Sequence, residues 1–218
     1  MSRIRVIILT KSSMKNSYCV AGINCSDNQW VRLVSENGTC SPALSKKMLY
    51  SDVGIIYPLD IVEVHIKNNP QDYRFQKENR LLDEKYPIKK VGKISFKKFL
   101  NFHPPENHEL IFGNNHGSIH SNHEKLASIN YSLMFIKVDN LRIHGPMLRK
   151  IKLDFTYNNV EYHEFSLTDP GYKNYLQDSN YLKDAQNKIL DSSYLVISFP
   201  EEKYSTYYYK FIAKIFQY

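Results

Sequence analysis

Residues 18–35 have the sequence YCVAGINCSDNQWVRLVS, in which two apolar stretches flank a polar turn. The turn contains Ser, Asp and Asn, whose side chains hydrogen-bond to nearby backbone groups and favour tight turns. In the second stretch, Val31 and Leu33 point to one side of an extended chain and Trp30 and Arg32 to the other, because side chains alternate along a strand. The stretch therefore predicts a β-hairpin with one face in a core.

The same alternation of apolar residues recurs on both sides of this hairpin. It predicts further strands at residues 4–8, 61–67, 73–82, 133–138, 150–155, 162–167, 195–199 and 208–216. Short helices are expected at residues 94–102 and 178–189, and Asp169-Pro170-Gly171 is expected to break the chain. This mostly β inventory fits two small Greek-key barrels of the oligonucleotide-binding (OB) type, each with a short helix. A single β-sandwich or a pair of SH3-like barrels would give the same periodicity.

Two domains are expected from the distribution of these elements. The first is an N-terminal, basic OB-like domain at residues 1–105, and the second is a C-terminal, near-neutral OB-like domain at residues 106–218. The pair Pro104-Pro105 ends the first half, because proline cannot continue a helix. Residues 106–130 are rich in His, Asn, Gly and Ser, and this composition predicts a linker at the start of the second half.

The charge of the chain is concentrated in its first half. The whole sequence has 29 Lys and Arg against 22 Asp and Glu, a formal net charge of +7. Residues 1–100 contain 17 basic and 9 acidic residues, whereas residues 101–218 contain 12 and 13. Six lysines fall between Lys85 and Lys98. This asymmetry indicates an acidic partner for the N-terminal half, and a solvated lysine-rich face is the alternative interpretation.

Composition also limits the class of protein. With 42% hydrophobic and 23% charged residues, the sequence is that of a globular chain, and it has no apolar run of the roughly 18 residues that a membrane span needs. There are three cysteines and no CxxC pair, so neither a disulfide framework nor a cysteine zinc site is indicated. The expected localisation is the cytoplasm, with no membrane partner.

Several segments of the first half together resemble a known family. They are Leu9–Ser13, Tyr18–Ile23, Trp30–Ser35, Leu59–Val62, Phe75–Arg80 and Val91–Ser95. This combination is similar to the opening of a bacterial family described as dual OB domain-containing proteins. The resemblance covers about residues 3–96, and in the second half it is limited to the strand pattern and the closing run Tyr209–Ala213. It implies two OB folds, a role with nucleic acid and frequent association with bacterial defence systems, and it implies no established enzymatic activity.

Trp30 and Arg32 are the leading candidates for a binding site. On one face of a strand they would place a ring for base stacking beside a guanidinium for phosphate. The alternative is that Trp30 packs inside and that Arg32 pairs with Glu78. Gln76 and Asn79 form a polar group that Arg32 could reach, with a structural or a ligand-binding role.

Lysines extend the candidate nucleic-acid site. Lys11, Ser12 and Lys15 follow the first strand, where an OB fold has its first ligand-binding loop. Lys93 lies in the lysine run and would continue the same track of positive charge.

The sequence contains no strong indication of a catalytic site. There is no phosphate-binding glycine loop, zinc-protease motif or nucleophile elbow, and no cofactor is expected. His116, His120 and His123 have helical spacing, but the surrounding Gly and Asn predict a loop, so no metal site is expected. The sequence thus favours a non-catalytic, sequence-tolerant DNA- or RNA-binding protein. The alternatives are an accessory subunit with a protein partner at its C-terminal half, and a metal-dependent nuclease or nucleotide-modifying enzyme.

Overall fold

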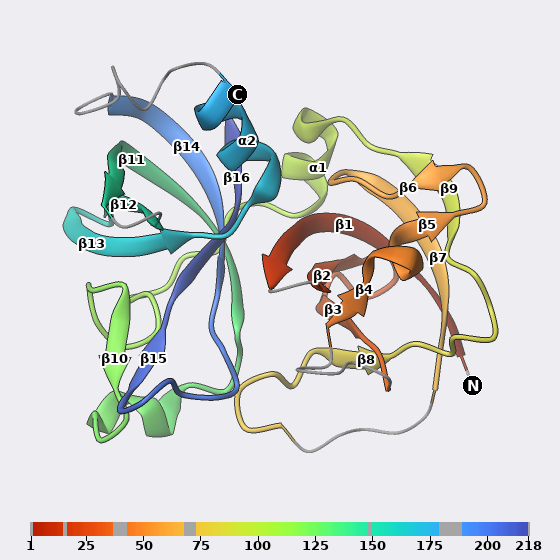
Figure 1. Cartoon of the computed structure of the whole chain (residues 1–218), viewed down its shortest axis with the longest axis horizontal. Helices are drawn as coiled ribbons and strands as arrows, with labels where there is room; N and C mark the ends of the chain where they lie inside the picture. Colours follow the sequence, from red (N-terminus) through yellow and green to blue (C-terminus); the bar gives the residue numbers. More distant parts are fainter. Residues whose placement is uncertain are drawn as a thin grey trace. The chain divides into compact units, whose positions relative to one another are not determined.

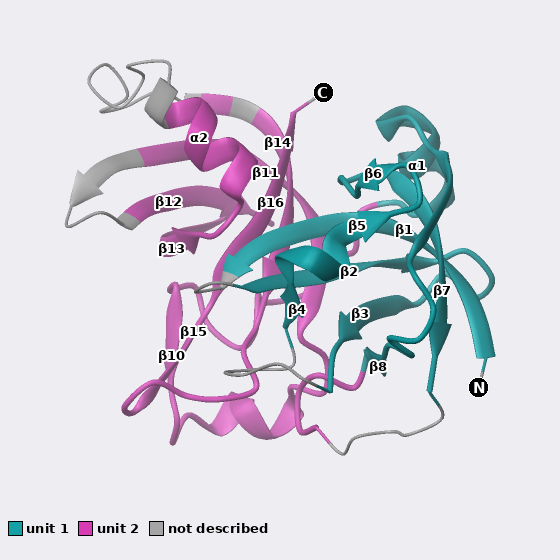
Figure 2. Cartoon of the chain, turned by 45° about the vertical axis from the view of Figure 1, so that its right-hand side comes forward, with its two compact units in different colours: residues 1–72, 78–104 teal, residues 73–77, 105–218 magenta. Residues whose placement is uncertain are grey.

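The computed structural model describes residues 2–14, 17–36, 43–67, 73–147, 150–178 and 189–217. The chain divides into two compact units (Figure 2). Unit 1 comprises Met1–Asp72 and Glu78–Pro104, and unit 2 comprises Tyr73–Lys77 and Pro105–Tyr218. The chain therefore enters unit 2 at residue 73, returns to unit 1 at residue 78, and enters unit 2 again at residue 105.

Unit 1 is built on one curved, mostly antiparallel sheet (Figure 1). In spatial order its main strands are β8 (Asn79–Leu81), β3 (Trp30–Val34), β2 (Ser17–Asn24), β1 (Ser2–Met14), β7 (Asp60–Ile66) and β9 (Lys89–Lys93). The short elements β4 (Leu44–Ser45), η1 (Lys46–Leu49), β5 (Tyr50–Ser51) and β6 (Gly54–Ile55) lie in the chain between β3 and β7, and α1 (Phe96–Phe102) follows β9.

The sheet of unit 1 curls back on itself. β3 and β8 pair in parallel, and an antiparallel bridge joins Ile66 at the end of β7 to Leu82 just after β8. Two backbone hydrogen bonds support this closure, from the Lys67 N–H to the Leu81 carbonyl and from the Asp83 N–H to the His65 carbonyl, each 2.9 Å. Strands β1, β2, β3, β8 and β7 therefore form the ring of a five-stranded Greek-key barrel.

The hairpin predicted from residues 18–35 is present as β2 and β3. Ile23 faces Trp30 across the turn, and Asn28 at the turn has a φ of 58°, a conformation that asparagine tolerates better than most residues. Gly22 allows β1 to come close, because a Cβ there would lie 1.9 Å from the Ile7 carbonyl oxygen. Inside the barrel the apolar side of each strand forms the core, with Val6, Ile8, Val20, Val31, Leu33, Val62 and Val64.

Unit 2 contains a closed barrel. Its strands, in order around the barrel, are β11 (Leu133–Met147), β12 (Lys150–Tyr157), β13 (Val160–Leu167), β16 (Phe211–Gln217) and β14 (Ile189–Ser198). β13 and β16 are parallel and the other neighbours antiparallel, and α2 (Pro170–Asp178) lies in the chain between β13 and β14. Five strands in this order with a helix after the third are the OB arrangement. The predicted mostly β fold with two OB-like barrels is confirmed.

Residues 106–130 do not form a linker. They belong to unit 2, where they form β10 (Ser118–His120) and η2 (Glu124–Ser128), and β10 pairs with β15 (Tyr207–Tyr209). Apolar residues scattered among the Asn and His enter the core of the unit, namely Ile111, Phe112, Ile119, Leu126 and Ile129. The composition was misleading because these core positions follow no regular period.

Two other expectations differ from the structure. The segment Asp169-Pro170-Gly171 begins helix α2: the Asp169 carboxylate accepts hydrogen bonds from the Gly171 and Tyr172 N–H groups, and proline is well tolerated in a first helical turn. Of the strand expected at residues 73–82, only β8 is a strand. The helix expected at residues 178–189 falls largely outside the described residues.

Candidate nucleic-acid interface

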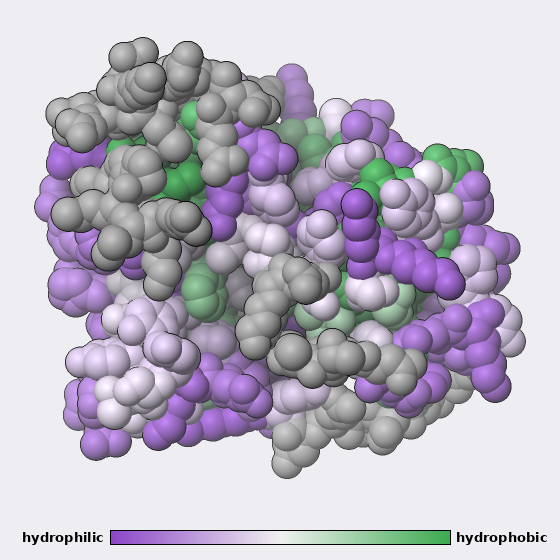
Figure 3. Space-filling model, viewed as in Figure 1, coloured by the Kyte–Doolittle hydropathy of each residue, from purple (hydrophilic) through white to green (hydrophobic). Residues whose placement is uncertain are grey.

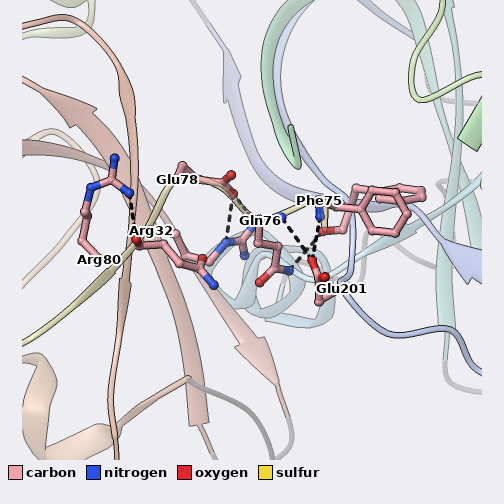
Figure 4. A network of polar contacts seen from close by, with 8 residues as sticks. Arg32, Phe75, Gln76, Glu78, Arg80 and Glu201 are labelled. Atoms are coloured by element: carbon pink, nitrogen blue, oxygen red, sulfur yellow. Dashed lines mark hydrogen bonds and ion pairs between the residues drawn. The ribbon is translucent and has the colours of Figure 1, made fainter. Parts of the chain in front are cut away.

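Arg32 is fixed by a buried ion pair within unit 1 (Figure 4). Only 5% of Arg32 is exposed, and its Nε and Nη2 both donate to Oε1 of Glu78 at 3.2 Å. The backbone N–H of Arg32 also donates to the Glu78 carbonyl. A buried charge is tolerated when it is paired and hydrogen-bonded, so these contacts stabilise the pairing of β3 with the chain at β8.

Trp30 lies at the start of β3 and is half-buried. Its ring meets the ring of His103 edge-on at a centroid distance of 6.2 Å. The Asn28 side chain donates to the Phe102 carbonyl and contacts Nδ1 of His103 at 2.7 Å. Trp30 is thus next to the end of helix α1, and strand alternation places it on the same side of β3 as Arg32.

Gln76 and Asn79 lie in different units. Gln76 is buried in unit 2, where its Nε2 donates to the Phe199 carbonyl at 3.3 Å. Asn79 begins β8 in unit 1 and is the register partner of Arg32. The polar group expected from the sequence is therefore split between the two units, with Gln76 in unit 2 and Asn79 in unit 1.

Glu201 holds the segment around Gln76 (Figure 4). No pattern in the sequence indicated this role. Its carboxylate accepts hydrogen bonds from three consecutive N–H groups of Arg74, Phe75 and Gln76, at 2.6, 2.9 and 3.1 Å. Phe75 is fully buried, and its ring meets the rings of Phe199 and Tyr208 edge-on. These contacts explain why residues 73–77 belong to unit 2.

Lys11 is placed beside an exposed aromatic ring. Its Nζ donates to the Ile56 carbonyl at 2.9 Å and lies 4.4 Å from the centroid of Tyr57, a cation–π distance. Tyr57 is 55% exposed. Of the other residues predicted near Lys11, Ser12 is buried and Lys15 lies outside the described residues.

Asp60, which was not predicted, connects the Tyr57 segment to a lysine of β9. It is 1% exposed at the start of β7, and its carboxylate accepts from the Tyr57 N–H at 2.9 Å and lies 2.8 Å from Nζ of Lys90. Lys93, which is exposed, is its register partner on β9. Burial lowers the pKa of Lys11, and the charge of Asp60 opposes that effect. We call Lys11, Tyr57, Asp60, Lys90 and Lys93 the Asp60 cluster.

The acidic residues of unit 1 are unevenly exposed. The unit contains 15 Lys and Arg against nine Asp and Glu. Among the residues that the structure describes, four of those carboxylates are buried, namely Asp60, Glu63, Glu78 and Asp83. Because these acidic side chains are buried while most lysines reach the surface, the surface of the unit is more positively charged than its net composition indicates.

Apolar and aromatic side chains accompany these cations. In the described part of unit 1, the exposed fraction is 45% or more for Tyr50, Val53, Tyr57, Tyr86 and Val91. Figure 3 shows hydrophobic residues over β6 and β9 directly beside hydrophilic ones. Lys89, Val91 and Lys93 alternate as the exposed positions of β9.

The histidines predicted at helical spacing are separated by local structure. His116 forms a bridge with His163, His120 lies in β10, and His123 caps η2 by accepting from the Lys125 N–H. Among the described residues no group of three or more His, Cys, Asp or Glu is arranged to hold a metal ion. In the same residues, no helix has the length and apolar character needed to cross a membrane.

Comparison with protein families gives a match over nearly the whole chain. The model of the family described as "Dual OB-containing domain" matches residues 4–215. Among solved structures, "Crystal structure of Ifi202 HINa domain in complex with 20bp dsDNA" has a TM-score of 0.37 and 9% identity, covering 91% of this chain and 84% of that one. "Crystal structure of the tetrameric p202 HIN2" has a TM-score of 0.35 and 8% identity, covering 99% and 92%. No curated protein matches the sequence.

Proposed function

The chain belongs to the family of dual OB-containing domains, and from this premise we propose that it binds nucleic acid through unit 1, without catalysis and without strong sequence preference. The observation that carries the proposal is the Asp60 cluster: Lys11 lies against the exposed ring of Tyr57, and the buried Asp60 carboxylate pairs with Lys90 and stands opposite Lys93 in the sheet. Of the residues predicted from the sequence, Lys11 and Lys93 belong to this cluster.

The chemistry of the Asp60 cluster suits a phosphodiester backbone. Exposed lysines neutralise phosphates and release counterions, which gives affinity that depends on salt and little on sequence. Tyr57 is available to stack on a base, and Lys11 against its ring supplies a cation close to that position. Lysines without a fork of directed donors do not discriminate between base edges, so binding is sequence-tolerant.

The test is binding of labelled single-stranded DNA, single-stranded RNA and duplex DNA, measured by fluorescence anisotropy over a series of salt concentrations. The variant Lys11→Ala/Lys93→Ala should weaken binding and lower the slope of log K against log salt by about one for each phosphate that is no longer neutralised. Lys137→Ala is the matched control, because Lys137 is an exposed lysine of β11 in unit 2. The proposal is wrong if no ligand binds at low salt, or if the double variant binds like the control.

The family resemblance also supports a cellular setting. We propose that the protein acts in the bacterial cytoplasm within a defence system and that its near-neutral second half binds a protein partner. The measurement is phage plating efficiency on cells that carry the system with the wild-type chain or with Lys11→Ala/Lys93→Ala. Equal plating on both strains, at equal protein levels, would show that defence does not depend on the nucleic-acid site of unit 1.

A further inference from the structure

A group of tyrosines in unit 2 is not used by the core. Tyr204 is 77% exposed, Tyr207 is 41% exposed and Tyr209 is half-buried. Side chains alternate along β15, so Tyr208 points inward and packs on Phe199, while Tyr207 and Tyr209 point outward. Packing in the core explains the position of the Tyr208 ring, but it does not explain the positions of the other three rings.

The backbone holds these three rings in a defined arrangement. Tyr204 and Tyr207 exchange two backbone hydrogen bonds, of 2.9 and 3.2 Å, across a tight turn in which Ser205 has a φ of 57°. Tyr207 and Tyr209 are also paired with β10, opposite His120 and Ser118. The rings are therefore mounted on paired strands, which limits the conformational freedom that is given up when a ligand binds.

The rings do not cover one another. The ring of Tyr209 lies 6.5 Å from that of Tyr204 and 6.4 Å from that of Tyr207, with interplanar angles of 57° and 51°. Rings at such angles are not stacked face to face. His120 meets Tyr207 at 5.2 Å with an angle of 87° and borders the group.

The surroundings of the rings are polar. Glu202, Lys203, Ser205 and Thr206 are all exposed. In Figure 3 the surface over β10 and β15 is pale, between hydrophilic regions, without a strongly hydrophobic patch. The core of a protein interface is instead depleted of charged residues and more apolar. These exposed flat rings stand among hydroxyls and charges of both signs, and Lys203 can contact a phosphate. Such surroundings favour a ligand with both flat faces and a charged backbone, which is a nucleic-acid strand.

We propose that Tyr204, Tyr207 and Tyr209 form a stacking platform for unpaired bases, a second nucleic-acid site on unit 2. The class of ligand rests on the proposed function of unit 1, whereas the position of the site rests on the tyrosines alone. The platform binds single strands in preference to duplexes, because the bases of a duplex have their faces covered by their neighbours. Lys203 is the cation best placed in sequence to accompany a strand over the rings.

The experiment compares a labelled single strand of about 15 nucleotides with a duplex of the same length. Tyr204→Ala/Tyr209→Ala should weaken binding of the single strand by roughly fivefold or more for each ring that stacks a base, and leave duplex binding unchanged. Tyr204→Phe/Tyr209→Phe should retain binding, because it keeps the rings and removes only the hydroxyls. Tyr175→Ala is the matched control, an exposed tyrosine of α2 in the same unit. Thermal unfolding of each variant checks that the fold is intact.

The outcomes separate this inference from the proposed function. If Lys11→Ala/Lys93→Ala weakens binding and Tyr204→Ala/Tyr209→Ala does not, the platform is wrong and the unit 1 site stands. If only the tyrosine variant weakens single-strand binding, the platform stands and the unit 1 site is wrong. If the wild-type chain binds no nucleic acid, or if the tyrosine variant loses only a co-purifying protein, the platform is overturned.

Discussion

Lys210 shows how one residue makes the stability of unit 2 depend on pH. It is fully buried, and its Nζ donates to the Ile111 carbonyl at 2.6 Å and to the backbone and side-chain oxygens of Asn114 at 2.8 and 2.6 Å. Burial lowers the pKa of Lys210 to about 6, because it removes the charged form from water. An unfolded chain keeps the ordinary lysine pKa of 10.5. At a pH between these two pKa values, the unfolded state binds more protons than the folded state.

The free energy of unfolding should therefore rise with pH between about pH 7 and pH 9, by at most about 1.4 kcal/mol per pH unit from this residue. Urea unfolding at several pH values measures it. Lys210→Met should flatten the rise, and Lys137→Met should preserve it, since Lys137 is exposed. Titration of the labelled lysine side chain by NMR reads the same pKa in the wild-type chain, and an ordinary lysine pKa there would contradict the prediction.

At the scale of elements, alternation and turn chemistry were enough to predict β2 and β3, because both signals are local. Helix α2 was missed because Asp-Pro-Gly is compatible both with a chain break and with a helix start. What decides between them is distant in sequence: the Asp169 carboxylate that caps the helix also lies 2.8 Å from Nζ of Lys214 on β16. The core residues of 106–130 were missed because a segment without a period carries no local signal.

Asp169 should be important for the stability of unit 2. The residue is 4% exposed and accepts from the Gly171 N–H at 3.0 Å in addition to its ion pair with Lys214. Asp169→Ala removes the helix cap and leaves a partly buried ammonium without this carboxylate, and it should lower the free energy of unfolding by roughly 2 kcal/mol or more. Asp169→Asn keeps an oxygen for the cap and should lower it less. Equal urea midpoints for Asp169→Ala and the wild type would refute this assignment.

At the scale of the whole molecule, the sequence predicted the fold better than it predicted the candidate site. Trp30 and Arg32 do lie on one side of β3, and Arg32 pairs with Glu78, which is the alternative that the sequence offered to a ligand contact. What brings the two side chains together is the parallel pairing of β3 with β8. Lys11 reaches Ile56 and Tyr57, which precede Asp60, and Lys93 lies opposite Asp60 because the strand that Asp60 begins pairs with both β1 and β9. Such proximity depends on sheet register, which periodicity in a single sequence does not encode.

Residues 73–77 should be required for the stability of unit 2 although they precede its main segment. Phe75 lies 5.1 Å from the ring of Phe199 and 5.4 Å from that of Tyr208. Phe75→Ala in the full chain should cost about 3–5 kcal/mol, as for other buried phenylalanines, seen as a lower urea midpoint. A fragment of residues 105–218 should be destabilised in the same way. Lys137→Ala, which alters an exposed side chain of β11 in the same unit, is the control.

The interleaving of the two units has a consequence for the evolution of the gene. Because the chain enters unit 2 at residues 73–77 before returning to unit 1, a recombination point between codons 104 and 105 separates Phe75 and Gln76 from the rest of the unit that buries them. The second barrel cannot be acquired from another gene as a self-sufficient cassette unless the donor supplies an equivalent of this segment. The two barrels are therefore expected to be inherited and exchanged as a pair, which agrees with a family model that spans both.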